Sequence, residues 1–102
     1  MEDKPYDYDP DKAAKNLKKH GVSFDEGYDA YCDPYAVELA RQYHPRTDGG
    51  IEERIPIIGR ASSFLLLVIC VETIISDRPR IVSTWIATRH DTAIYMAQFP
   101  NP

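Results

Sequence analysis

The sequence predicts an α+β fold with a mostly antiparallel sheet, two N-terminal helices and one C-terminal helix. Helix start and stop signals crowd into residues 9–34 and return at residue 88, whereas β-rich segments separated by short turns fill the chain between them. The length of 102 residues suits one core, and the hydrophobic fraction of 43% is that of a globular protein. We therefore expect a single domain over residues 1–102.

The first helix is expected over residues 10–19, after a short strand at residues 6–8. Asp9 is a good N-cap and Pro10 suits the first turn, whereas Gly21 ends the helix because it adopts positive φ without a Cβ clash. One face of this helix is cationic and the opposite face is apolar. The two sets are Lys12, Lys15, Lys18 and Lys19, and Ala13, Ala14 and Leu17.

The second helix is expected over residues 24–31. Ser23 and Glu26 form a capping-box pattern at its start. It should end near Asp33-Pro34, since the residue before a proline avoids the helical region. Residues 35–42 are predicted to form a strand, and residues 43–52 a polar, mobile loop.

Three further strands are predicted over residues 54–59, 64–73 and 80–86, with connections short enough for antiparallel hairpins. The middle strand is apolar on both sides. One side should pack on the first two helices, and the other on the last helix or on a second chain. Thr88, with Asp91 three residues on, predicts the start of the last helix, which continues until Pro100 stops it.

Charge and composition exclude several classes of protein. The net charge of −4 argues against non-specific nucleic-acid binding by the whole surface, although residues 10–20 concentrate four lysines beside one aspartate. An acidic N-terminus, the absence of a long apolar run and two cysteines without metal-type spacing predict a cytoplasmic protein that makes no membrane contact. No metal or cofactor is expected, because the histidines lack cluster spacing and no nucleotide-binding loop is present.

Several blocks of residues, in order along the chain, resemble the BrnT-type toxin family. They are Asp11-Lys12-x-x-x-Asn16-x-x-Lys19-His20-Gly21-Val22-Ser23-Phe24, Asp33-Pro34, Glu53-Arg54-x-x-x-Ile58-Gly59, Arg80-Ile81-Val82-Ser83 and Ala87-Thr88-Arg89. The resemblance implies a RelE-like ribonuclease fold and a type II toxin that cleaves mRNA and blocks translation. It also implies a cognate DNA-binding antitoxin, through which the complex would bind operator DNA.

Metal-independent RNA cleavage needs a base for the 2′-OH proton, cations for the phosphate and an acid for the leaving oxygen. Arg54 and Arg80 are the candidate phosphate ligands, because a guanidinium binds oxygens in bidentate fashion. Glu53 or His20 is the candidate base, and Lys19 or His20 the candidate acid. Alternatives without catalysis stay open. His20 could serve simply as a cap of the first helix, and the charged residues could form surface ion pairs.

The remaining candidate substrate-binding residues are Lys15, Trp85, Thr88 and Arg89. The chain departs from the family where Trp85 and Ile86 replace an Arg-Lys pair, and where Asp91-Thr92 replaces Glu-Arg. Trp85 could stack on a base or only pack in the core. Because one phosphate-side arginine is missing, the alternative is a catalytically weak module that binds the antitoxin in transcriptional autoregulation. A homodimer is a further possibility, suggested by the two-sided apolar strand.

Overall fold

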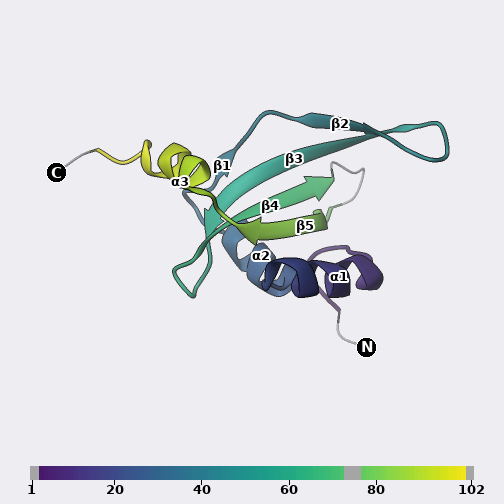
Figure 1. Cartoon of the computed structure of the whole chain (residues 1–102), viewed down its shortest axis with the longest axis horizontal. Coiled ribbons are helices and arrows are strands. Elements are labelled where there is room, and N and C mark those ends of the chain that lie inside the picture. The colour runs from purple at the N-terminus through teal and green to yellow at the C-terminus, as the bar shows by residue number, and fades with distance from the viewer. Residues whose placement is uncertain (1–2, 73–76, 101–102) are drawn as a thin grey trace.

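Three helices and a five-stranded antiparallel sheet make up the computed structural model, which describes residues 3–72 and 77–100 (Figure 1). The helices are α1 (Pro10–His20), α2 (Phe24–Tyr31) and α3 (Arg89–Met96). The strands are β1 (Val37–Glu38), β2 (Gln42–Pro45), β3 (Ile51–Arg60), β4 (Leu66–Glu72) and β5 (Arg80–Ile86). The predicted α+β class is confirmed.

The helix ends follow the local signals in the sequence. The Asp9 carboxylate accepts a hydrogen bond from the backbone N–H of Asp11, and Gly21 takes φ 73° while its N–H donates to the Leu17 carbonyl. Reciprocal capping boxes start α2 at Ser23 and α3 at Thr88. The predicted helix starts are therefore confirmed, and α1 is one residue longer than expected. The last helix ends at Met96, before Pro100, so its predicted extent was wrong by one turn.

The strands lie in the order β1–β3–β4–β5, and β2 also pairs with β3, beyond the end of β1. Figure 1 shows the β2–β3 hairpin extending past the rest of the sheet. The register places Arg54, Glu72 and Arg80 side by side on three neighbouring strands. The strand predicted at residues 6–8 is reduced to one parallel bridge between Asp7 and Arg80.

Two predictions about the middle of the chain were wrong. Residues 35–42 do not form one strand, because the pairing with β3 is interrupted between Glu38 and Gln42. Residues 43–52 are not a loop throughout, since residues 43–45 belong to β2, residues 51–52 belong to β3 and only residues 46–50 connect them. The predicted end of the central strand at Thr73 lies outside the described residues.

The two faces of the sheet have separate cores. Helices α1 and α2 cover one face, where Phe24 and Ala30 pack with Ile57, Ile69 and Ile81. On the other face a smaller cluster joins Ile58 and Val68 to Tyr95 of α3. All of β4 from Leu67 to Glu72 is buried, so the prediction that the last helix helps to cover its second side is confirmed. No second chain is needed to bury this strand.

Candidate active site

The sheet face on the side of α3 carries a row of charged side chains at the end of β4. Glu72 is buried between two arginines on neighbouring strands, with a relative exposure of 8%. Its carboxylate accepts from Arg46 in the β2–β3 turn and lies 3.5 Å from Nε of Arg80. The charge of Glu72 also helps to raise the pKa of Arg54, after the larger effect of Glu52. Arg54 and Arg80 therefore lie on either side of the Glu72 carboxylate, and their strands are about 10 Å apart at ~4.8 Å per strand. We call Arg54, Glu72 and Arg80 the arginine row.

Glu52 lies on the same face as Arg54, because alternate residues of a strand share a face. Nε of Arg54 donates to the Glu52 carboxylate over 2.6 Å. This hydrogen bond lowers the pKa of Glu52, and the charges of Arg54, Lys12 and Arg46 lower it further. Glu52 is therefore ionised at neutral pH and lies within electrostatic reach of the first turn of α1.

Glu53, the residue that sequence reasoning selected, lies on the opposite face of β3 from Arg54. Its carboxylate is 2.5 Å from a guanidinium nitrogen of Arg41, which precedes β2. Successive residues of a strand point to opposite faces, so Glu53 does not lie on the face that carries the arginine row. The structure brings Glu52 to that row instead.

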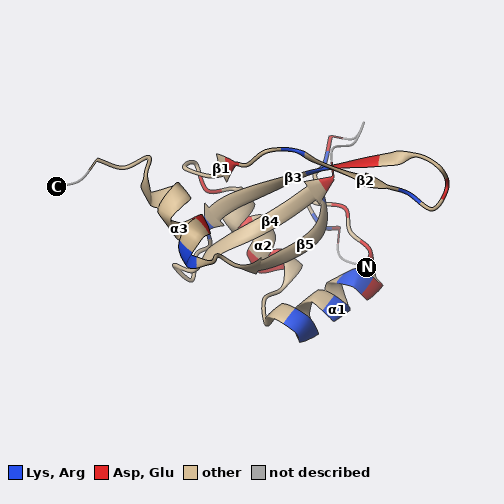
Figure 2. Cartoon of the chain, turned by 45° about the horizontal axis from the view of Figure 1, so that its top comes forward, with Lys and Arg blue, Asp and Glu red and all other residues tan. Residues whose placement is uncertain are grey.

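Helix α1 lines the site with lysines along the edge of β5. A cavity of about 210 Å³ lies between them, bordered by lysines 12, 15 and 19, Asn16 and His20 on the helix and by Val82 and Ser83 on the strand. Figure 2 shows basic residues in blue along α1. The lysines are exposed and recur every three or four residues, so they share one side of the helix. Lys18, which the helical periodicity predicts on the same face, does not border the cavity.

Asn16 explains why α1 stays beside β5. Its side-chain amide donates to the Thr84 carbonyl over 2.9 Å and accepts from the Thr84 N–H over 3.1 Å, as a neighbouring strand would. In a third hydrogen bond, the same amide group donates to the Val22 carbonyl. The amide thereby closes a strand edge and fixes where the lysines stand.

The C-terminal end of α1 lies near the C-terminal end of β5, whereas Arg80 is at the start of that strand. The rings of His20 and Trp85 have centroids 6.2 Å apart. Trp85 is five positions after Arg80, which is about 16 Å along the strand at ~3.3 Å per residue. Arg54 and Arg80 therefore lie at one end of β5, whereas His20 lies near Trp85 at the other, so the candidate residues form an elongated site along β5 and not one pocket.

Thr88 and Arg89 follow the end of β5 at the same end of the site as Trp85. The Thr88 hydroxyl accepts from the backbone N–H of Asp91, which is a capping role. Arg89 is exposed in the first turn of α3. Among residues 3–72 and 77–100, no group of three His, Cys, Asp or Glu side chains is arranged to hold a metal ion.

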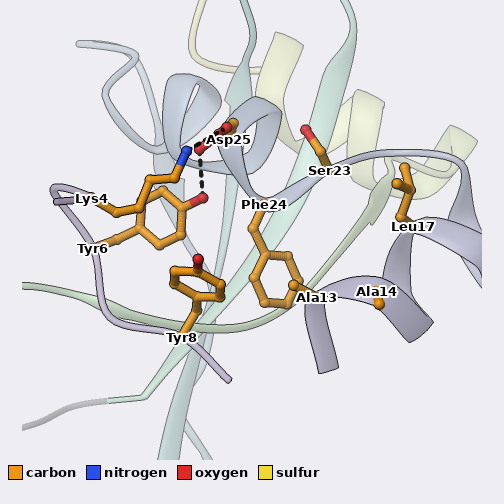
Figure 3. A pocket seen from close by; sticks show the side chains of 9 residues that line it. All are labelled: Lys4, Tyr6, Tyr8, Ala13, Ala14, Leu17, Ser23, Phe24 and Asp25. Carbon is orange, nitrogen blue, oxygen red and sulfur yellow. Dashed lines mark hydrogen bonds and ion pairs between the residues drawn. The ribbon is translucent and has the colours of Figure 1, made fainter. Parts of the chain in front are cut away.

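A second cavity, of about 240 Å³, lies on the apolar side of α1 and carries little chemistry (Figure 3). Tyr8, Phe24 and Leu17 border it. At its rim the Asp25 carboxylate accepts from the Tyr6 hydroxyl over 2.6 Å and from Lys4 over 3.1 Å. The tyrosine hydrogen bond is the main reason that the pKa of Asp25 is lowered. These contacts tie the N-terminal segment to α2.

Comparison with protein families decides the classification. The family model described as "Ribonuclease toxin, BrnT, of type II toxin-antitoxin system" matches residues 8–91, which include all the side chains of the arginine row and the first residues of α3. The chain belongs to the BrnT family. No curated protein sequence matches the chain.

A solved structure supports the BrnT fold. The ribonuclease toxin BrnT of Brucella abortus, determined at 1.1 Å resolution, is similar with a TM-score of 0.53 and 17% sequence identity. The match covers 82% of this chain and 96% of the Brucella chain. At this identity the likeness shows the fold alone, which is α+β as the sequence predicted. Membership of a type II toxin–antitoxin family also implies an antitoxin partner.

The sequence did not point to Glu52, Glu72, Arg46 and Lys12 as members of this candidate site. Glu52 could have been found, because the alternation rule places residue i−2, not i−1, beside Arg54. Glu72 and Arg46 meet only through the sheet register and the hairpin turn, which no local signal shows.

In the described part of the chain, no helix is long and apolar enough to cross a bilayer.

Proposed function

We propose that this BrnT-family toxin is a metal-independent endoribonuclease that cleaves mRNA and thereby inhibits translation. The observation that supports this most strongly is the arginine row, in which Arg54 and Arg80 flank Glu72 beside the ionised Glu52. The lysines of α1 add positive charge along the neighbouring strand edge. A phosphodiester is an anion that this arrangement suits.

In this proposal Arg54 and Arg80 hold the phosphate oxygens as negative charge grows on them. The glutamates beside them keep each guanidinium oriented before the substrate arrives. Binding of RNA would exchange part of these ion pairs for contacts with the phosphate. Such preorganised donors commonly contribute about 10²–10³ in rate each.

Glu52 is the proposed general base in place of Glu53. It accepts the proton of the 2′-OH, whose oxygen attacks phosphorus and displaces the 5′ oxygen, leaving a 2′,3′-cyclic phosphate. Lys12 is the proposed acid for the leaving oxygen, since its charge already acts on Glu52. Lys15, Lys19, His20, Trp85 and Arg89 serve as substrate contacts further along β5, and Thr88 holds the start of α3.

We propose that the antitoxin neutralises the chain by covering the cationic side of α1 and the arginine row. An acidic or apolar segment on that surface would compete directly with RNA. Contact with operator DNA would then be made by the antitoxin. A homodimer has less support, because one chain already buries β4.

The test is incubation of the purified chain with a labelled RNA in the presence of EDTA. Cleavage to cyclic-phosphate ends is expected, with a loss of about 10²–10³ in rate for Arg54→Ala and for Arg80→Ala. Arg41→Ala is the matched control, because Arg41 pairs with Glu53 on the other face. Intact RNA with the wild-type chain, together with tight antitoxin binding, would favour the binding module over the nuclease.

A further inference from the structure

Trp85 is the one tryptophan of the chain and stands at the boundary between core and surface. Part of its indole packs on the cluster of Ile58, Val68 and Tyr95, and the side chain stays partly exposed. The His20 ring lies beside it at 6.2 Å between centroids, with the planes inclined by 43°. An aromatic pair thus stands on the surface at the end of β5.

The aromatic pair continues the cationic edge described above. Ser83 and Trp85 alternate with Thr84 along β5 and so lie on the same face of the strand. Ser83 borders the cavity that Lys15 and Lys19 line, and His20 borders it as well. The exposed lysines of α1 therefore lie in a row that leads to the two rings. No carboxylate is among the residues that border this cavity.

We infer that Trp85 and His20 form a stacking platform for an unpaired base, and that the substrate is single-stranded RNA lying along β5. This inference rests on the proposed function, which places the reacting phosphodiester at Arg54 and Arg80. Aromatic platforms beside a basic groove bind single strands, because every base offers a flat π-face. A duplex stacks its bases on one another and does not offer them.

The dimensions support a substrate of several nucleotides. The platform lies about 16 Å along β5 from Arg80 at ~3.3 Å per residue. Successive nucleotides of a stacked strand rise only ~3.4 Å. The base on Trp85 therefore belongs to a nucleotide separated from the reacting phosphate, so the platform sets where along the strand cleavage occurs.

The single tryptophan makes the inference directly measurable. The full chain is titrated with a single-stranded 2′-O-methyl oligoribonucleotide, which lacks the 2′-OH nucleophile and is not cleaved. Saturable quenching of tryptophan emission is expected, with little change for the same strand in a duplex or with abasic sugars throughout. Binding seen by anisotropy of a labelled strand without quenching, or equal quenching by the duplex, overturns the inference.

Variants separate stacking from structural support. Trp85→Ala should weaken single-strand binding by about 5- to 150-fold, the range found for stacking aromatics, whereas Trp85→Phe keeps a ring in the core and should stay within about fivefold. Lys19→Gln should reduce the salt dependence of binding, and Lys18→Gln, outside the cavity, should not. Equal affinity of Trp85→Ala and wild type overturns the inference.

The failure of each proposal has its own signature. A wild-type chain that cleaves RNA in EDTA but shows no quenching overturns the stacking platform alone. A chain whose emission is quenched by the single strand but which leaves RNA intact overturns the nuclease and supports the platform.

Discussion

At the scale of single residues, the buried amide of Asn16 acts as a piece of strand. Its amide forms hydrogen bonds with the N–H and the carbonyl of Thr84 and with the carbonyl of Val22, just after α1. The Asn16 side chain is buried, with a relative exposure of 7%. Replacing it leaves buried donors and acceptors without partners, each costing about 1–3 kcal/mol. A helix face covered in lysines would otherwise have little to hold it against β5.

Asn16→Ala should therefore lower the free energy of unfolding by about 2–4 kcal/mol. Urea denaturation followed by circular dichroism measures the change. Lys15→Ala, on the exposed side of the same turn, is the control and should stay within about 0.5 kcal/mol. Equal stability of the two variants would show that α1 is held by other contacts.

Thr84 offers a stabilising change. Its hydroxyl is buried and has no hydrogen-bond partner among the described residues, and its side chain packs against Gly27. Thr84→Val keeps the shape of the side chain and removes the unpaired hydroxyl, so the free energy of unfolding should rise by about 1–3 kcal/mol. A lower melting temperature for this variant would mean that the hydroxyl is satisfied in solution.

The pH dependence of cleavage tests Glu52 as the base. A base must be unprotonated, and the hydrogen bond from Arg54 holds the pKa of Glu52 below its ordinary value of 4.5. The fall in rate that protonation of this group causes should therefore be centred below pH 4.5. Initial rates at each pH measure this, with circular dichroism to show that the chain is folded. A fall centred above pH 6 would assign the base to another group.

At the scale of elements, α2 lies directly on β3. A Cβ at Gly59 would lie 2.0 Å from the carbonyl oxygen of Ala30, so only glycine fits there. Just beyond this contact, Asp33 receives hydrogen bonds from the Tyr95 hydroxyl and from the backbone N–H groups of Tyr35 and Arg60. Burial alone would raise the pKa of Asp33, but these bonds lower it. The ends of α2, β3 and α3 are thus joined at one carboxylate.

Gly59→Ala should abolish cooperative folding or cost more than about 3 kcal/mol, because backbone atoms would have to move apart. Gly50→Ala in the β2–β3 turn is the control, since its new methyl group would meet only side-chain atoms at 3.2 Å and beyond. Thermal melting of both variants measures the difference. A normal melting transition for Gly59→Ala would refute the close contact of α2 with β3.

The elements also show what the sequence can and cannot predict. Helix starts at Asp9, Ser23 and Thr88 were predictable because a cap depends on residues a few positions apart. The division of the expected strand into β1 and β2 was not predictable from the sequence, since it depends on how β3 pairs with both segments. The same limit hid Glu72, which meets Arg46 and Arg80 only through pairing of distant strands.

At the scale of the whole molecule, the acidic chain separates its charges by place. Basic side chains follow α1 and the arginine row, whereas acids such as Asp25 and Asp29 occupy α2 on the far face of the sheet. A polyanion can therefore approach one side of a molecule whose net charge is −4. The lysine face of α1 was predictable from helix periodicity, whereas the position of Arg54 and Arg80 relative to α1 depends on the pairing of distant strands.

The central claim is that RNA is cleaved on the α3-side face of the sheet, where Arg54, Glu72 and Arg80 stand. Glu52 and Glu53 are adjacent in sequence and lie on opposite faces, so Glu52→Gln and Glu53→Gln form a matched pair. Cleavage of a labelled RNA in EDTA should fall about 10²–10⁴-fold for Glu52→Gln, the usual contribution of a general base, and stay within a few-fold of wild type for Glu53→Gln. Loss of cleavage in Glu53→Gln with full activity in Glu52→Gln would contradict the account.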